Sequence, residues 1–160
     1  MTPVFLGLGS NIEPARYLPV GLQALEDLLG DVQRSAVYEG EAMGFAGDPF
    51  WNLVVAVHTP WSVGDLQRAL RAVEYAQGRP RKATRYSART LDIDILTYGD
   101  HTGTHHGVEL PRGEILEHAF VLRPLAELAP DALHPLLKRP YAALWAEFDQ
   151  ASQPLRAVSL

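Results

Sequence analysis

The chain has 160 residues, 47% of them apolar, and a formal net charge of -5, a size that fits one packed domain over residues 1–160 better than two. It contains no cysteine, which excludes disulfides, thiolate metal sites and a cysteine nucleophile. It shows no basic leader and no run of roughly 20 apolar residues, so we expect a cytoplasmic protein that enters no membrane. Its negative net charge disfavours general nucleic-acid binding.

The first third of the chain reads as a strand, a helix and two further strands. Residues 4–8 form an apolar run that a Gly-Ser-Asn turn ends, which predicts a buried strand. Leucines at helical spacing predict a helix from about Pro14 to Gly30, with the prolines near its start. Residues 32–38 and 52–58 are expected strands, and a glycine-containing loop over 39–49 connects them.

The second helix has the clearest start signal. Ser62 can cap it, Asp65 completes a capping box, and Trp61 can pack on Leu66. Residues expected to face the core are Leu66, Leu70 and Val73. Gly78 should end the helix.

After a basic segment, apolar residues 91, 93 and 95 alternate with Asp92 and Asp94, which predicts a strand with one carboxylate-lined face. Residues 114–129 should be helical with a break near Pro124, and a last helix is expected around Leu144 and Phe148. The order of elements predicts an α+β ferredoxin-like sandwich, with a mainly antiparallel sheet and added C-terminal helices.

The aspartate pair and the basic segment together suggest a nucleotide-phosphate site. A strand's two-residue period aims Asp92 and Asp94 to the same side, and paired carboxylates suit Mg²⁺. The five cations just upstream, which would neutralise a polyphosphate, are Arg79, Arg81, Lys82, Arg85 and Arg89. Alone, the pair is also compatible with a solvated strand face, and the basic segment with surface solubility. No P-loop or dinucleotide-binding motif is present.

The string RKATRYSARTLDIDIL resembles the signature of the hydroxymethyldihydropterin pyrophosphokinases. The segments GLGSN, FWN and AFVLRPLAELAP are similar to other landmarks of that family, in the same order. The resemblance implies a ferredoxin-like fold and a reaction in which the pterin's hydroxymethyl oxygen attacks the β-phosphorus of ATP. AMP would be released, in a step of folate biosynthesis.

The resemblance also implies roles for individual residues. Asp92 and Asp94 would hold two Mg²⁺ ions, and Arg79 and Arg89 would contact the phosphates and the reacting centre. Positions near ATP would be Glu74, Arg81, Lys82 and Tyr86. For the pterin, Phe50 and Phe120 would sandwich the ring, Asn52 would read its amide edge, and Met43 would lie in the adjoining loop.

The sequence departs from the family pattern in two places. Arg112 stands where many members have His, and His118 stands where they have Arg, so we expect both at the ATP phosphates with more of the binding on Arg112. Residues 40–42 are Gly-Glu-Ala where members often carry a Thr-Pro-Pro-like run, which predicts a less rigid loop. Residues 39–49 and 78–88 are the expected closing segments.

Two other functions fit part of the pattern. A metal-dependent phosphohydrolase would use Asp92 and Asp94 to activate water, but it needs a positioned base that the sequence does not offer. An RNA-binding module shares the order of elements and predicts exposed aromatic residues on the central strands, where the two aspartates would instead repel a phosphate backbone. Since no sustained heptad is present, a monomer is the default expectation.

Overall fold

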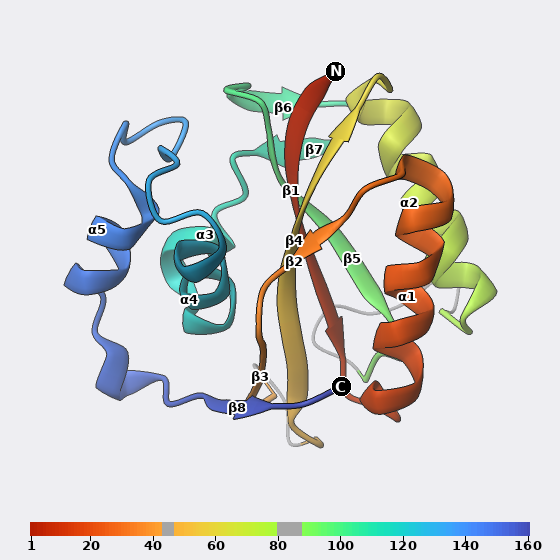
Figure 1. Ribbon diagram of the computed structural model, residues 1–160, viewed down its shortest axis with the longest axis horizontal. Helices are drawn as coiled ribbons and strands as arrows, with labels where there is room; N and C mark the ends of the chain where they lie inside the picture. The colour runs from red at the N-terminus through yellow and green to blue at the C-terminus, as the bar shows by residue number, and fades with distance from the viewer. Residues whose placement is uncertain (43–46, 80–87) are drawn as a thin grey trace.

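An antiparallel sheet forms the centre of the computed structural model, which describes residues 1–42, 47–79 and 88–160 (Figure 1). Within these residues six strands belong to the sheet: β1 (Thr2–Ser10), β2 (Gln33–Arg34), β3 (Val37–Gly40), β4 (Phe50–Thr59), β5 (Asp92–Tyr98) and β8 (Arg156–Val158). The strand order is β5-β1-β4-β3-β8, and β2 pairs with β4. The part β5-β1-β4-β3 has the strand order of a ferredoxin-like sheet, so the predicted fold class is confirmed.

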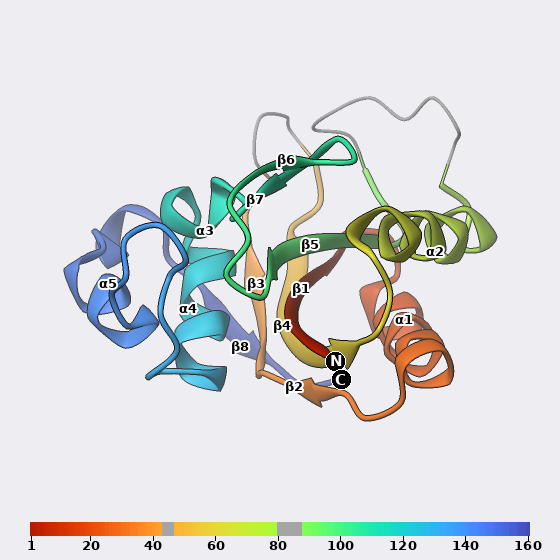
Figure 2. The same ribbon diagram turned by 90° about the horizontal axis from the view of Figure 1, so that it is seen from above.

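Helices cover both faces of the sheet. Figures 1 and 2 show α1 (Pro14–Leu29) and α2 (Val63–Ala76) on one face, and the helices α3 (Glu114–Glu117), α4 (Ala119–Leu128) and α5 (Tyr141–Glu147) on the other. A hairpin of β6 (Gly103–His105) and β7 (Val108–Leu110) leads from β5 to α3. Among the described residues, none of the helices combines the length and the apolar character that crossing a membrane requires.

Alternating apolar residues divide the core into two layers. The layer under α1 and α2 is built from Val4, Leu6, Leu8, Leu53, Val55, Val57, Ile93 and Ile95. On the opposite face, Val54 and Leu96 pack with buried residues of α4 and α5. The polar residues Asn52, Asp92 and Asp94 lie on the same face as Val54 and Leu96, as the two-residue period of a strand requires.

The predicted helix boundaries are confirmed at three positions. The Ser62 side chain accepts a hydrogen bond from Asp65 N at 3.1 Å, and α2 begins at the next residue. Gly30, with φ of 82°, follows the last residue of α1. Gly78, with φ of 97°, follows the C-terminal cap of α2 at Gln77.

The predicted strand over residues 32–38 is interrupted. Arg34 lies opposite Val55 and Tyr38 lies opposite Asn52, so this side has one residue more than β4 and a bulge separates β2 from β3. Ser35 fills the gap, because its Oγ accepts the hydrogen bond from Val54 N at 3.0 Å. A side-chain hydroxyl thus replaces a backbone carbonyl in the ladder.

The predicted helix break near Pro124 was wrong. The break lies at His118, whose extended backbone (φ -123°, ψ 124°) separates α3 from α4, whereas Pro124 lies inside α4. Pro19 likewise lies inside α1, not at its start. Each proline forfeits one backbone hydrogen bond, which the burial of neighbouring leucines such as Leu122 and Leu18 offsets.

Candidate active site

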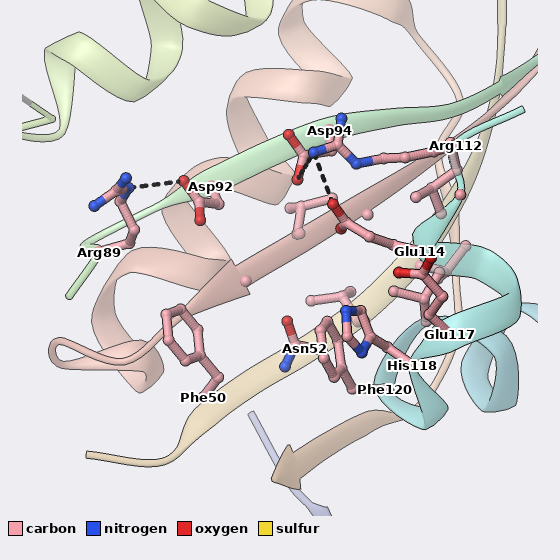
Figure 3. Close-up of a pocket in the computed structure, with 18 of the residues that line it drawn as sticks. Phe50, Asn52, Arg89, Asp92, Asp94, Arg112, Glu114, Glu117, His118 and Phe120 are labelled. Atoms are coloured by element: carbon pink, nitrogen blue, oxygen red, sulfur yellow. Dashed lines mark ion pairs between the residues drawn. The ribbon is translucent and has the colours of Figure 1, made fainter. Parts of the chain in front are cut away.

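A cavity of about 720 Å³ opens on the sheet face that carries Asn52, Asp92 and Asp94 (Figure 3). Its floor is bare backbone, because Gly7 and Gly9 of β1 lie between β4 and β5. Gly9 pairs with Asn52 on one side and with Asp92 on the other. Side chains of β4 and β5 therefore face the same space across β1, which contributes no side chain there.

Arginine side chains surround the carboxylates of Asp92 and Asp94. Asp92 Oδ1 is 3.3 Å from Arg79 Nη1 and 3.4 Å from Arg89 Nε, and Arg71 Nη2 is 3.9 Å from Asp94 Oδ1. Burial, followed by the negative charges of Asp94 and Glu74, raises the pKa of Asp92 to about 6 despite these arginines. A cation bound at the two carboxylates would offset the repulsion between them.

Glu74 supports this site from beneath and does not line the cavity. Its side chain is fully buried, and Oε2 accepts the hydrogen bond from Ile93 N at 2.7 Å, between the two aspartates. Its Oε1 accepts from Arg79 at 3.1 Å and from Arg71. Burial raises the pKa of Glu74, although these hydrogen bonds oppose the rise. The predicted nucleotide-site residue thus positions β5 and two arginines.

The other half of the cavity is aromatic. Phe50 and Asn52 come from β4, and His118 and Phe120 come from the start of α4 (Figure 3). Asn52 is only 8% exposed, and its Nδ2 has no hydrogen-bond partner in the part of the chain that the structure describes. A buried amide donor without a partner is costly, and a ligand with a hydrogen-bond acceptor would satisfy it.

Arg112 stands between the two halves. Its Nη2 is 3.0 Å from Glu114 Oε1 and 3.9 Å from Asp94 Oδ2, and the side chain lines the cavity. The guanidinium therefore neutralises a carboxylate of α3 and faces the aspartate pair. His118 lies elsewhere, with its ring stacked on Phe120.

Several residues that line the cavity were not predicted from the sequence, and four predicted site residues lie outside the described ranges. The missed charged residues are Glu41, Arg71, Glu109, Glu114 and Glu117. Only Arg71 had a local signal, because it lies three residues before Glu74 on the same helix. The predicted residues outside the described ranges are Met43, Arg81, Lys82 and Tyr86. Residues 43–46 of one expected closing segment and 80–87 of the other also lie outside them.

The sequence of the chain is similar to that of a known enzyme family. A sequence model of the family described as 7,8-dihydro-6-hydroxymethylpterin-pyrophosphokinase (HPPK) matches residues 5–130. A 2-amino-4-hydroxy-6-hydroxymethyldihydropteridine pyrophosphokinase from Pseudomonas aeruginosa is 40% identical over 132 residues, which cover 80% of this chain and 81% of the relative. The enzyme of the same name from Aquifex aeolicus is 32% identical over 142 residues, 88% of each chain.

A solved structure shares the fold at low sequence identity. The crystal structure of Plasmodium falciparum HPPK-DHPS superposes with a TM-score of 0.73 at 14% identity. The match covers 92% of this chain and 43% of that longer one. At this identity the likeness concerns the fold alone.

Proposed function

The chain belongs to the 7,8-dihydro-6-hydroxymethylpterin-pyrophosphokinase family, and we propose that its cavity binds ATP and 6-hydroxymethyl-7,8-dihydropterin side by side. The enzyme transfers pyrophosphate from ATP to the pterin's hydroxymethyl group, which gives the pterin diphosphate and AMP in folate biosynthesis. The observation that carries the proposed arrangement is the division of one cavity into a charged half and an aromatic half.

The charged half would hold the polyphosphate. Arg79 and Arg89 are proposed to bind phosphate oxygens, because a planar guanidinium can grip two oxygens at once. Asp92 and Asp94 fit Mg²⁺, since both are carboxylates on one face of a rigid strand. The pKa of Asp92 is raised first by burial and then by the negative charges of Asp94 and Glu74, which a bound cation would offset. Two Mg²⁺ ions, when bound, would neutralise negative charge on the phosphates.

The aromatic half would select the pterin. Phe50 and Phe120 are proposed to stack on the ring's two faces, and Asn52 to hydrogen-bond its amide edge through the unpartnered Nδ2. Met43 would add to this side, and Arg81, Lys82 and Tyr86 to the ATP side, as the family resemblance implies.

The reaction depends on the alignment of the two substrates and needs no covalent intermediate with the protein. The hydroxymethyl oxygen forms a bond to the β-phosphorus while the bond to the oxygen shared with the α-phosphorus breaks, so that AMP leaves. Arg79 and Arg89, fixed by contacts to Asp92 in the free protein, would turn to the phosphates and stabilise the negative charge that grows there.

The two rival functions fit less well. The RNA-binding mode stacks bases on aromatic residues of an uncovered sheet, but here α4 packs on β4 and fills part of that face. A phosphohydrolase would release phosphate from ATP without a pterin.

We propose a monomer that acts in the cytoplasm on small molecules and binds neither nucleic acid nor membrane.

The test is an incubation of the purified protein with ATP, Mg²⁺ and 6-hydroxymethyl-7,8-dihydropterin, with AMP measured by chromatography. Asp92→Ala and Asp94→Ala are run alongside after circular dichroism has shown that they fold. AMP that forms only with the pterin present and is lost in both variants supports the proposal. AMP formation that persists in either variant would overturn the assignment of the aspartate pair.

A further inference from the structure

His118 occupies the junction between α3 and α4, and its backbone is held from both sides. Its N–H donates to Glu114 O at 3.0 Å, and its carbonyl accepts from Leu122 N at 3.0 Å. The next residue, Ala119, donates its N–H to Gln153 Oε1 at 2.9 Å. These hydrogen bonds fix the backbone of His118 and therefore the direction of its Cα–Cβ bond.

The imidazole is held by stacking. Its ring lies 4.9 Å from the ring of Phe120, with an interplanar angle of 12°. Nδ1 of His118 is buried and has no hydrogen-bond partner among residues 1–42, 47–79 and 88–160. Packing on Phe120, with no hydrogen bond through Nδ1, thus fixes the imidazole, and in return the imidazole supports a phenyl ring that lines the cavity.

The position of His118 separates it from the phosphate half. The arginines that flank Asp94 are Arg71 and Arg112. Figure 3 shows His118 beside Phe120 and near Asn52, across the cavity from Arg89 and Asp92. His118 therefore lies in the aromatic half of the cavity and not in the charged half.

We propose that His118 is a positioning residue for the pterin, which acts by holding the Phe120 ring in place, and that it is not an ATP-phosphate ligand. This proposal rests on the proposed function, because it assigns Phe120 to the pterin. A ring that is already fixed loses less side-chain freedom when a ligand stacks on it, so the supporting imidazole raises pterin affinity. It also explains how a histidine serves where the family pattern has an arginine.

The experiment measures pterin binding and ATP binding separately. Isothermal titration gives the Kd for 6-hydroxymethyl-7,8-dihydropterin without ATP, and the Kd for Mg-ATP without pterin, for wild type, His118→Ala and His118→Phe. We expect His118→Ala to weaken pterin binding about three- to tenfold, the loss of one aromatic stack. His118→Phe keeps the stack without the nitrogens, so its pterin Kd should stay within about twofold of wild type.

The Mg-ATP Kd decides between the two roles. A phosphate ligand would make both variants lose ATP affinity, whereas a positioning residue leaves it unchanged in both. Equal Tm values for the variants and for His58→Ala, an exposed histidine on β4, separate the effect from general destabilisation.

Weakened Mg-ATP binding, or a pterin Kd that is unchanged in His118→Ala, would overturn the role of His118 while wild-type turnover still supports the proposed function. A wild-type protein that neither binds the pterin nor forms AMP would overturn both.

Discussion

Replacing Asp92 with asparagine should stabilise the metal-free protein while it abolishes turnover. Burial and the charges of Asp94 and Glu74 raise the pKa of Asp92 from 3.8 to about 6. The folded protein therefore binds the Asp92 proton more tightly than the unfolded chain does, and it loses stability as pH rises from about 4 to about 6. Asparagine resembles the protonated carboxyl and escapes this loss.

The pKa shift sets the size of the effect. A rise of about two pH units corresponds to roughly 3 kcal/mol at neutral pH. Because the Asp92 side chain is 30% exposed, solvent screens part of this energy, and we expect Asp92→Asn to gain about 1–2 kcal/mol at pH 7.5. The carboxylate is thus kept for function at a cost in stability.

Urea denaturation followed by tryptophan fluorescence, in EDTA and at pH values from 4.5 to 8, measures the gain. The difference between Asp92→Asn and wild type should be about a third of its full size at pH 4.5 and reach its full size above about pH 6.5. Asp131→Asn, at an exposed aspartate outside the cavity, serves as the control. A variant that is less stable than wild type at pH 7.5, or a difference that does not grow with pH, would show that the Asp92 carboxylate does not destabilise the fold.

Three further predictions concern the floor of the cavity, a helix cap and the buried glutamate. A Cβ at Gly9 would lie 2.6 Å from Asn52 Oδ1, so Gly9→Ala should raise the KM for pterin about tenfold in steady-state assays. Gly7→Ala, whose Cβ would make only ordinary contacts, should change it less than about twofold. Ser62→Ala removes the cap of α2 and should lower the free energy of unfolding in urea by about 1 kcal/mol without a change in kcat. Glu74→Ala leaves two arginines without their buried partner and should cost about 3 kcal/mol in the same measurement.

The features that sequence predicted well are those set by neighbours along the chain. The two-residue period of a strand placed Asp92 and Asp94 on one face, and the capping box of Ser62 and Asp65 located the start of α2. Both depend on local geometry, which a short stretch of sequence contains in full.

What sequence did not predict depends on packing between distant segments. Only the family resemblance placed Glu74 near the nucleotide, and its burial was not predicted, because nothing on α2 shows that β5 will cover it and donate Ile93 N. Glu109 and Glu117 join the cavity only through the path that the β6–β7 hairpin and α3 take across the sheet. The helix break lies at His118, whose extended backbone is the N-cap of α4, while Pro124 lies inside that helix.

Phosphorus NMR of the complete reaction mixture distinguishes pyrophosphate transfer from other reactions of ATP. With ATP, Mg²⁺ and 6-hydroxymethyl-7,8-dihydropterin, we expect the ATP signals to be replaced by those of AMP and of a diphosphate ester on the pterin, in equal amounts. Signals of ADP with a pterin monophosphate, or of free phosphate, would contradict the transfer of pyrophosphate as one unit.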